Sequence, residues 1–254
     1  MTDAPSLDTL NGMSAEELAA RLSGPPEARA ALVRTAAEGG VAEAQAVYGQ
    51  MLLDGVGVEL DPREALRWFS RAAAQGHLLA INMVGRCYDL GWGVAIDKAR
   101  AAEWYRTAAR RGLDWGMYNY ATLLALGHGV VEDRPAALDW LRKAAALGNA
   151  KAINFVGSFY EDGWVVERDT AVAAEHYARA AAGGDFRGHF NHARMLIGEG
   201  RIDEAMAAIE RAGVGATPRF RGQMAGFLLA STSPELREVG ARLNAEIDSH
   251  YKLA

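Results

Sequence analysis

The sequence predicts an all-α protein, an α/α solenoid of helix-turn-helix repeats with a 36-residue period. Three observations support this prediction. A fifteen-residue phrase occurs twice, as AINMVGRCYDLGWGV at 80–94 and AINFVGSFYEDGWVV at 152–166, with nine identical positions. The two copies begin 72 residues apart, and glycines, aspartates and alanines recur at half of this distance, every 36 residues. Apolar residues within a repeat are spaced by three and four positions, which indicates one buried face of a helix.

Four repeats follow one another between about residues 41 and 184 without an insertion or deletion. The columns that define them are Gly55, Gly91, Gly127 and Gly163; Asp61, Asp97, Asp133 and Asp169; Ala72, Ala108, Ala144 and Ala180; and Gly76, Gly112, Gly148 and Gly184. A further column holds Trp68, Trp104, Trp140 and, in fourth place, His176. We expect the three tryptophans of this column to lie in the core.

Each repeat is predicted to contain two helices joined by a short loop. In the first repeat the helix that carries Tyr48 ends at Gly55, because glycine accepts the positive φ of a helix end. Asp61 is predicted to cap the second helix, with Pro62 in the first helical position and Glu64 completing a capping box. The small alanines of that helix allow neighbouring helices to approach closely.

The ends of the chain carry degenerate repeats. Residues 26–38 are predicted to form the second helix of an earlier repeat, and Thr217-Pro218 and Ser233-Pro234 to begin two closing helices. Three regions follow: an N-terminal cap with a degenerate repeat at 1–40, four repeats at 41–184, and a degenerate repeat with capping helices at 185–254. Atypical ends suit an open stack, whose outer faces meet water.

The repeat resembles a known family. Its loop signature occurs as Gly55-Val56-Gly57-Val58, Gly91-Trp92-Gly93-Val94 and Gly127-His128-Gly129-Val130, while the fourth repeat departs from it with Gly163-Trp164-Val165-Val166. This pattern is similar to the Sel-one-like repeat (SLR) family, which is related to tetratricopeptide repeats. The resemblance implies a right-handed superhelix and a role as an adaptor or scaffold for proteins or peptides.

Candidate binding residues follow from the same resemblance. If the first helix of each repeat lines the concave side of the solenoid, polar and aromatic residues of these helices point into a groove. The predicted groove residues are Asn82, Arg86, Trp115, Tyr118, Lys151, Asn154, Ser158, Arg187, Phe190 and Arg194. Amides can hold a peptide backbone, arginines bind carboxylates, and an exposed Trp-Tyr pair is typical of a binding hot spot. The loop edge with Trp92 and Trp164, and the convex face, are alternative surfaces.

Catalytic motifs are not found in the sequence. It has no Walker loop, dinucleotide-binding glycine fingerprint, nucleophile elbow or HExxH motif, so we expect no catalytic residue and no cofactor. His189 and His192 are spaced as i and i+3 on one helix, but a zinc site needs further ligands, and we expect no metal. The single cysteine, Cys87, excludes an intramolecular disulfide and is expected to be a buried apolar residue.

Composition and charge narrow the function further. A net charge of −5 argues against a general nucleic-acid partner, and no apolar run is long enough for a membrane span. The first residues do not form a secretory signal, so we expect a cytoplasmic protein. The sequence therefore favours a non-catalytic scaffold that binds a protein or peptide on its concave surface. The alternatives are a hydrolase or transferase with a site near His189 and His192, and a structural subunit of a homo-oligomer.

Overall fold

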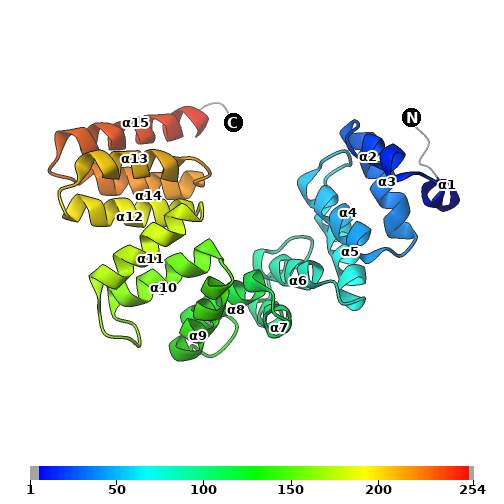
Figure 1. Ribbon diagram of the computed structural model, residues 1–254, viewed down its shortest axis with the longest axis horizontal. Helices are drawn as coiled ribbons and strands as arrows, with labels where there is room; N and C mark the ends of the chain where they lie inside the picture. Colours follow the sequence, from blue (N-terminus) through cyan, green and yellow to red (C-terminus); the bar gives the residue numbers. More distant parts are fainter. Residues whose placement is uncertain (1–5, 252–254) are drawn as a thin grey trace. The chain divides into compact units, whose positions relative to one another are not determined.

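The computed structural model describes residues 6–251, and every regular element in that range is a helix (Figure 1). The predicted all-α class is therefore confirmed. By its backbone contacts the chain divides into an N-terminal body, Met1–Trp140, and a C-terminal body, Leu141–Ala254. The outer ends of the predicted terminal regions, residues 1–5 and 252–254, lie outside the described residues.

The N-terminal body contains α1 (Leu7–Asn11), α2 (Ala15–Leu22), α3 (Pro26–Glu38), α4 (Ala42–Asp54), α5 (Pro62–Ala74), α6 (Leu78–Leu90), α7 (Lys98–Arg110) and α8 (Asp114–Leu126). The boundary between the bodies falls within α9 (Arg134–Ala146). The C-terminal body continues with α10 (Ala150–Asp162), α11 (Thr170–Ala182), α12 (Phe186–Gly198), α13 (Ile202–Gly213), α14 (Pro218–Leu229) and α15 (Pro234–Tyr251). The helices from α4 to α11 alternate as the first and second helices of the four predicted repeats.

The glycine loops end each first helix as predicted. Gly91 caps α6 in the left-handed conformation, with φ 77°. Two residues later Gly93 passes so close to the start of α5 that a Cβ atom would lie 2.3 Å from the carbonyl oxygen of Pro62. In the fourth repeat Val165 adopts φ 53°, so this loop keeps a left-handed residue although the glycine is missing.

The four aspartates join the two helices of each repeat. The side chain of Asp61 accepts hydrogen bonds from the backbone N–H groups of Arg63 and Glu64, at 3.0 and 2.9 Å. Its own backbone N–H donates to the carbonyl of Leu52 at 2.9 Å, which ties the start of α5 to α4. The capping box predicted here is wrong, because Glu64 bonds Arg67 instead. A true capping box forms at Ser14 and Glu17, where α2 begins.

The closest packing within a repeat is between a first-helix glycine and an aromatic ring of the second helix. A Cβ atom on Gly85 of α6 would lie 2.7 Å from the Tyr105 ring of α7. The same contact joins Gly49 to Phe69 at 2.9 Å. The missing side chain therefore lets the two helices approach closely, and Tyr105 is 1% exposed. The equivalent pair in the C-terminal body is Gly157 and Tyr177.

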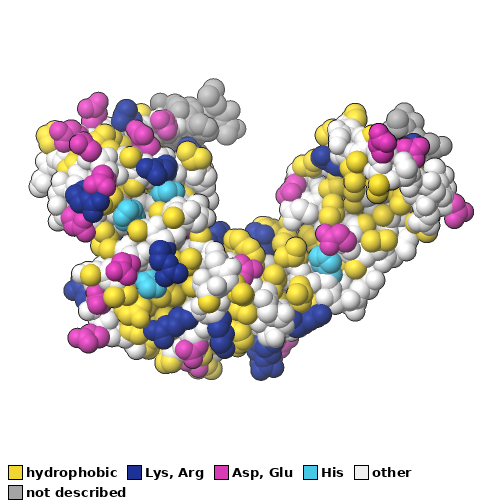
Figure 2. Space-filling model, in the orientation of Figure 1, with side chains coloured by type: hydrophobic (Ala, Val, Ile, Leu, Met, Phe, Trp, Pro, Cys, Tyr) yellow, Lys and Arg dark blue, Asp and Glu magenta, His cyan; other side chains and the backbone are white. Residues whose placement is uncertain are grey.

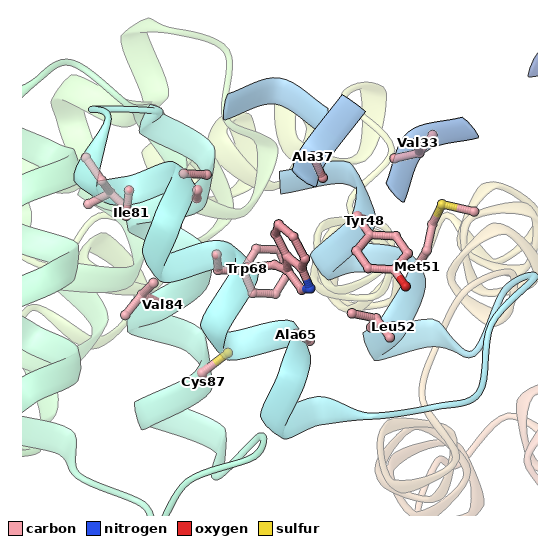
Figure 3. Close-up of a cluster of buried hydrophobic side chains, with 14 of the residues drawn as sticks. Val33, Ala37, Tyr48, Met51, Leu52, Ala65, Trp68, Ile81, Val84 and Cys87 are labelled. Atoms are coloured by element: carbon pink, nitrogen blue, oxygen red, sulfur yellow. The ribbon is translucent and has the colours of Figure 1, made fainter. Parts of the chain in front are cut away.

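The expectation for the tryptophan column is only partly correct. Trp68 is buried and meets Tyr48 edge-to-face at 5.4 Å within the cluster drawn in Figure 3. Trp104 and Trp140, however, are only partly buried. The large side chains one residue later lie deeper, since Phe69, Tyr105, Leu141 and Tyr177 are at most 1% exposed. Each tryptophan is next to one of these buried residues on the same helix and covers part of the same surface. Trp104 and Trp140 therefore lie at the rim of the core.

The two closing helices are confirmed. Thr217 caps α14 by accepting a hydrogen bond from the backbone N–H of Phe220 at 3.3 Å. Ser233 accepts one from Leu236 at 3.3 Å at the start of α15. Both helices pack with α12 and α13 on a common cluster that includes Met224. The C-terminal body therefore has its own hydrophobic core.

Gly85→Ala tests the close contact between α6 and α7. It is expected to lower the free energy of unfolding by about 1–3 kcal/mol, because the added methyl meets a buried ring that has no room to move. The cost should shrink in a Tyr105→Leu background, since leucine is smaller. Chemical unfolding of the two single variants and the double variant measures this coupling.

Gly226→Ala is the matched control, because nothing lies within 4 Å of a methyl group at this exposed position of α14. It is expected to leave stability unchanged or raise it by up to about 1 kcal/mol, as alanine favours helix. An equal cost for Gly85→Ala with and without Tyr105 would contradict the packing account.

Candidate binding surface

The predicted groove residues fall on first helices of both bodies. In the N-terminal body, Leu79 and Arg86 project from α6, and Trp115 and Tyr118 from α8. We call these four residues the α6–α8 face. Leu79 and Trp115 are 52% and 41% exposed, whereas Arg86 and Tyr118 are partly buried. Trp115 meets Tyr118 edge-to-face, with ring centroids 6.3 Å apart.

The asparagines of the repeated phrase are not exposed groove residues. Asn82 and Asn154 are 5% and 7% exposed, so the expectation that they hold a peptide directly is wrong. Asn82 accepts a hydrogen bond from the side-chain amide of Asn119 at 3.0 Å, and Asn154 accepts one from Asn191 at 2.9 Å. Each pair joins the first helices of two successive repeats. A buried amide needs such a partner, so these residues set the register of the helices.

Arg86 has unusual surroundings. Its guanidinium carbon lies 4.6 Å from the centre of the Trp92 ring in the loop after α6. Within the described part of the chain, its side chain makes one hydrogen-bonding contact, from Nη1 to the sulfur of Met83 at 3.6 Å. Among the described residues, no carboxylate oxygen lies within 4.0 Å of its nitrogen atoms. The aromatic ring thus covers one side of this partly buried cation, and none of the described carboxylates forms an ion pair with it.

A carboxylate next to this face is already occupied. Asp89 of α6 pairs with Lys98 and accepts a hydrogen bond from the Tyr105 hydroxyl at 3.1 Å. Burial, and then the charge of Asp89, raises the pKa of Tyr105, so the phenol stays protonated and remains a donor. The carboxylate of Asp89 therefore has Lys98 and Tyr105 as its partners, and it forms no ion pair with Arg86.

The C-terminal body contains an equivalent cluster with a different charge balance. Glu161, 72 residues after Asp89, pairs with Arg194 at 2.7 Å and accepts a hydrogen bond from the Tyr177 hydroxyl at 2.6 Å. Ser158 replaces Arg86 at the equivalent position and lies 3.3 Å from the same hydroxyl. Glu161 and Arg194 balance each other, whereas Asp89, Lys98 and Arg86 leave one positive charge; Arg168 donates only to the backbone carbonyl of Glu161, at 2.9 Å.

The remaining predicted residues of the C-terminal body differ in exposure. Phe190 is 6% exposed and packs edge-to-face on Phe220 and Phe227, so it is a core residue and the expectation of a groove residue is wrong. Arg187 is exposed and lies over Phe186 and Phe220, at 4.9 and 5.5 Å from the ring centres. Lys151 is partly buried.

Charges are intermixed over the face seen in Figure 2, with dark blue side chains gathered at its lower edge over α7. That helix carries Lys98, Arg100, Arg106 and Arg110 against one acid, Glu103. Arg106 and Arg110 are exposed, and no carboxylate of the described residues pairs with them. Lys98 pairs with Asp89 of α6, whereas Arg106 and Arg110 of this second helix pair with no carboxylate of the described residues.

Comparisons with known proteins identify the repeat. The family model described as Sel1 repeat matches residues 42–77, 78–113, 116–149 and 150–185. The chain belongs to the Sel1 repeat family. The matched segments agree with the four repeats expected at 41–184. Leu79 and Arg86 lie in the second matched segment, Tyr118 in the third and Asn154 in the fourth, while Trp115 directly precedes the third.

Several solved structures share this fold, and two of them are described as a Sel1 repeat protein or as having an SLR fold. A Sel1 repeat protein from Oxalobacter formigenes is similar with a TM-score of 0.70, at 24% identity, over 83% of this chain and 89% of that one. The protective antigen c5321 of uropathogenic Escherichia coli has a TM-score of 0.65 at 24% identity, over 89% of this chain and 49% of that one. The immunity protein Pa5087 from Pseudomonas aeruginosa has a TM-score of 0.55 at 20% identity, over 82% of each chain.

The comparison with curated protein sequences gave no match. Across the described residues, no helix is both long enough and apolar enough to cross a membrane.

The two histidines of α12 are partly buried. Burial, followed by the charge of Arg211, lowers the pKa of His189, and burial, followed by Arg201, lowers that of His192. Neutral imidazoles could ligate a metal, but within the described part of the chain no group of three or more potential ligands surrounds them. Their surroundings are those of packing residues in the degenerate repeat that follows the Sel1 repeats.

The two Asn–Asn hydrogen bonds between first helices were not predicted from the sequence. Asn119 and Asn191 each lie 37 residues after the asparagine that they bond, a spacing one residue longer than the repeat. That spacing is visible in the sequence once successive first helices are compared. The stacking of Arg86 on Trp92 has no such signal, because it depends on how the Sel1 loop folds back over α6.

Asn82→Ala tests the structural role of the buried asparagine pair. It is expected to lower the free energy of unfolding by about 1–3 kcal/mol, because the Asn119 amide loses its acceptor in a region largely closed to water. Asn244→Ala, at an exposed position of α15, is the matched control and should change stability by less than about 0.5 kcal/mol. Chemical unfolding measures both, and an unchanged stability for Asn82→Ala would show that the pair does not hold the repeats together.

Cys87 provides a pH-dependent test of burial. It is fully buried, and burial raises the pKa of its thiol to about 11. Since only the thiolate reacts, a thiol reagent at about pH 8 is expected to modify the folded protein at least about 100-fold more slowly than the unfolded protein. The rate should rise with pH towards the raised pKa. Equal rates for the folded and unfolded protein would contradict the burial of Cys87 in the cluster that α6 forms with α5.

Proposed function

We propose that this Sel1 repeat protein is a non-catalytic binding module that captures a peptide or a partner helix on its first helices. The observation that carries the proposal is Trp115, a large aromatic residue that is 41% exposed on a helix whose other apolar residues largely face the core. Tyr118 meets it edge-to-face and holds the indole in place. Exposed, pre-positioned aromatic residues are typical anchors of protein interfaces.

The repeat architecture supports the same function. Sel1 repeat proteins generally mediate protein–protein interactions, and stacked helix pairs present their first helices as one continuous surface. Leu79 extends the aromatic pair with a second exposed apolar side chain, 52% exposed. The α6–α8 face is therefore the primary surface of the proposal, and the accessible Lys151, Ser158 and Arg187 of the C-terminal body form a secondary one.

The compartment is part of the proposal. We place the protein in the cytoplasm, where the buried, unpaired thiol of Cys87 would remain reduced. Detection of the native protein after fractionation of its host cells tests this placement, and recovery outside the cytoplasmic fraction would contradict it.

The double variant Trp115→Ala, Tyr118→Ala tests the binding surface. Affinity capture from lysates of the native host, followed by quantitative mass spectrometry, should recover partners with the wild-type protein and at least about tenfold less of them with the double variant, because hot-spot truncations cost about 2 kcal/mol or more. A thermal melt checks that the double variant is folded.

The matched control is Ile96→Ala, Val131→Ala, which removes two apolar side chains that are 63% and 88% exposed on the interhelical loops. It should retain the partners. If the loop variant loses the partners and the aromatic variant keeps them, the binding surface is the loop edge instead. If light scattering across a range of concentrations shows that the captured partner is the chain itself, the protein is a homo-oligomer.

A further inference from the structure

The two asparagine-linked helix pairs allow a direct comparison of charge. In the C-terminal body, Glu161, Arg194 and Tyr177 satisfy one another, and the position equivalent to Arg86 holds the neutral Ser158. In the N-terminal body, Lys98 and Tyr105 satisfy Asp89, and Arg86 is additional. The position of Arg86 therefore holds a cation where its counterpart, Ser158, is neutral, while Leu79 and Trp115 correspond to Lys151 and Arg187.

Arg86 is prepared for an anion. A guanidinium that is partly removed from water loses solvation, and an aromatic ring compensates for only part of that loss. Stacking on Trp92 at 4.6 Å also fixes the plane of the group, and apart from the contact of Nη1 with the Met83 sulfur its N–H groups have no acceptor among the described residues. A fixed planar fork of donors matches the two oxygens of a carboxylate.

The apolar part of the face lies along the same helix. Leu79 is seven residues before Arg86, which corresponds to about 10 Å along α6. The Asn82–Asn119 hydrogen bond sets the register of α6 and α8 and brings Trp115 to the level of Leu79. A peptide in the extended polyproline II conformation has three residues per turn and covers about 9 Å in them, so residues three apart point to the same side. A bulky apolar side chain over Trp115 and Leu79 would thus be followed or preceded, three residues away, by a side chain at Arg86.

We propose that the α6–α8 face binds an extended protein segment in which an aspartate or glutamate pairs with Arg86 and a bulky apolar residue, about three positions away, packs on Trp115 and Leu79. This inference rests on the proposed function and adds the chemistry of the ligand to it. Charge complementarity selects the acidic side chain, and the exposed indole selects the apolar one.

Selection from a displayed library of random twelve-residue peptides, fixed at both ends within a carrier protein, tests the inference. Wild-type protein should enrich peptides with an acidic residue about three positions from a bulky apolar one. For a selected peptide made synthetically with blocked ends, replacing its acidic residue by the neutral amide should weaken binding about tenfold or more.

Variants of Arg86 assign the preference to this residue. Arg86→Glu should replace the acidic preference by a preference for lysine or arginine. Arg86→Met keeps a long side chain against Trp92 without the charge, and should retain apolar enrichment while the acid-to-amide difference falls to within about twofold. Arg106→Glu, an equal charge change at an exposed position of α7, is the matched control and should select the same peptides as the wild type.

The outcomes separate this inference from the proposed function. Enriched peptides without an acidic preference, or with one that survives Arg86→Met, would overturn the inference and leave the binding function standing. Enrichment only in a second library with free C-terminal carboxyl groups would overturn the choice of an acidic side chain. If neither library is enriched, the proposed peptide-binding function and the inference are both contradicted.

Discussion

The contact between a first-helix glycine and the ring of the second helix is the constraint on which the other features depend. Because Gly85 has no side chain, Tyr105 packs directly against the α6 backbone and is almost fully buried. Its hydroxyl then reaches Asp89 near the end of α6. The buried ring of Tyr105 therefore also supplies a hydrogen-bond donor to the carboxylate of Asp89. Gly157, Tyr177 and Glu161 repeat this chain of contacts in the C-terminal body.

The 72-residue similarity has a structural cause beyond the 36-residue repeat. Asn82 and Asn154 are buried and bond the next first helix, so alternate repeats share an internal link that the others lack. Around this shared link the surface chemistry differs. At one site Arg86 stacks on Trp92, while at the other the neutral Ser158 takes the place of Arg86 and Glu161 pairs with Arg194. The packing of the two sites is thus alike, while their surface residues differ. This is consistent with a repeat protein in which only some of the repeats recognise the ligand.

The helices of the repeats could be predicted from the sequence, because the glycine columns, the aspartate caps and the apolar spacing depend on local backbone structure. It was less informative about burial within a helix. Trp104 is one position from the buried Tyr105, and a spacing of three and four residues fits both positions. The asparagines were expected on the surface because polar residues usually face water, yet a partner at a 37-residue spacing satisfies them in the interior. The stacked Arg86 could not be predicted, since it depends on a loop conformation and on which carboxylate Lys98 occupies.

A crystal structure of the protein with a peptide selected by the library is the most direct test of the binding account. The account predicts that the peptide lies along α6 and α8 in an extended conformation, with its carboxylate oxygens hydrogen-bonded to the Arg86 guanidinium and its bulky apolar side chain against Trp115. A peptide bound along the interhelical loops, on the second helices, or solely on the C-terminal body would contradict the account.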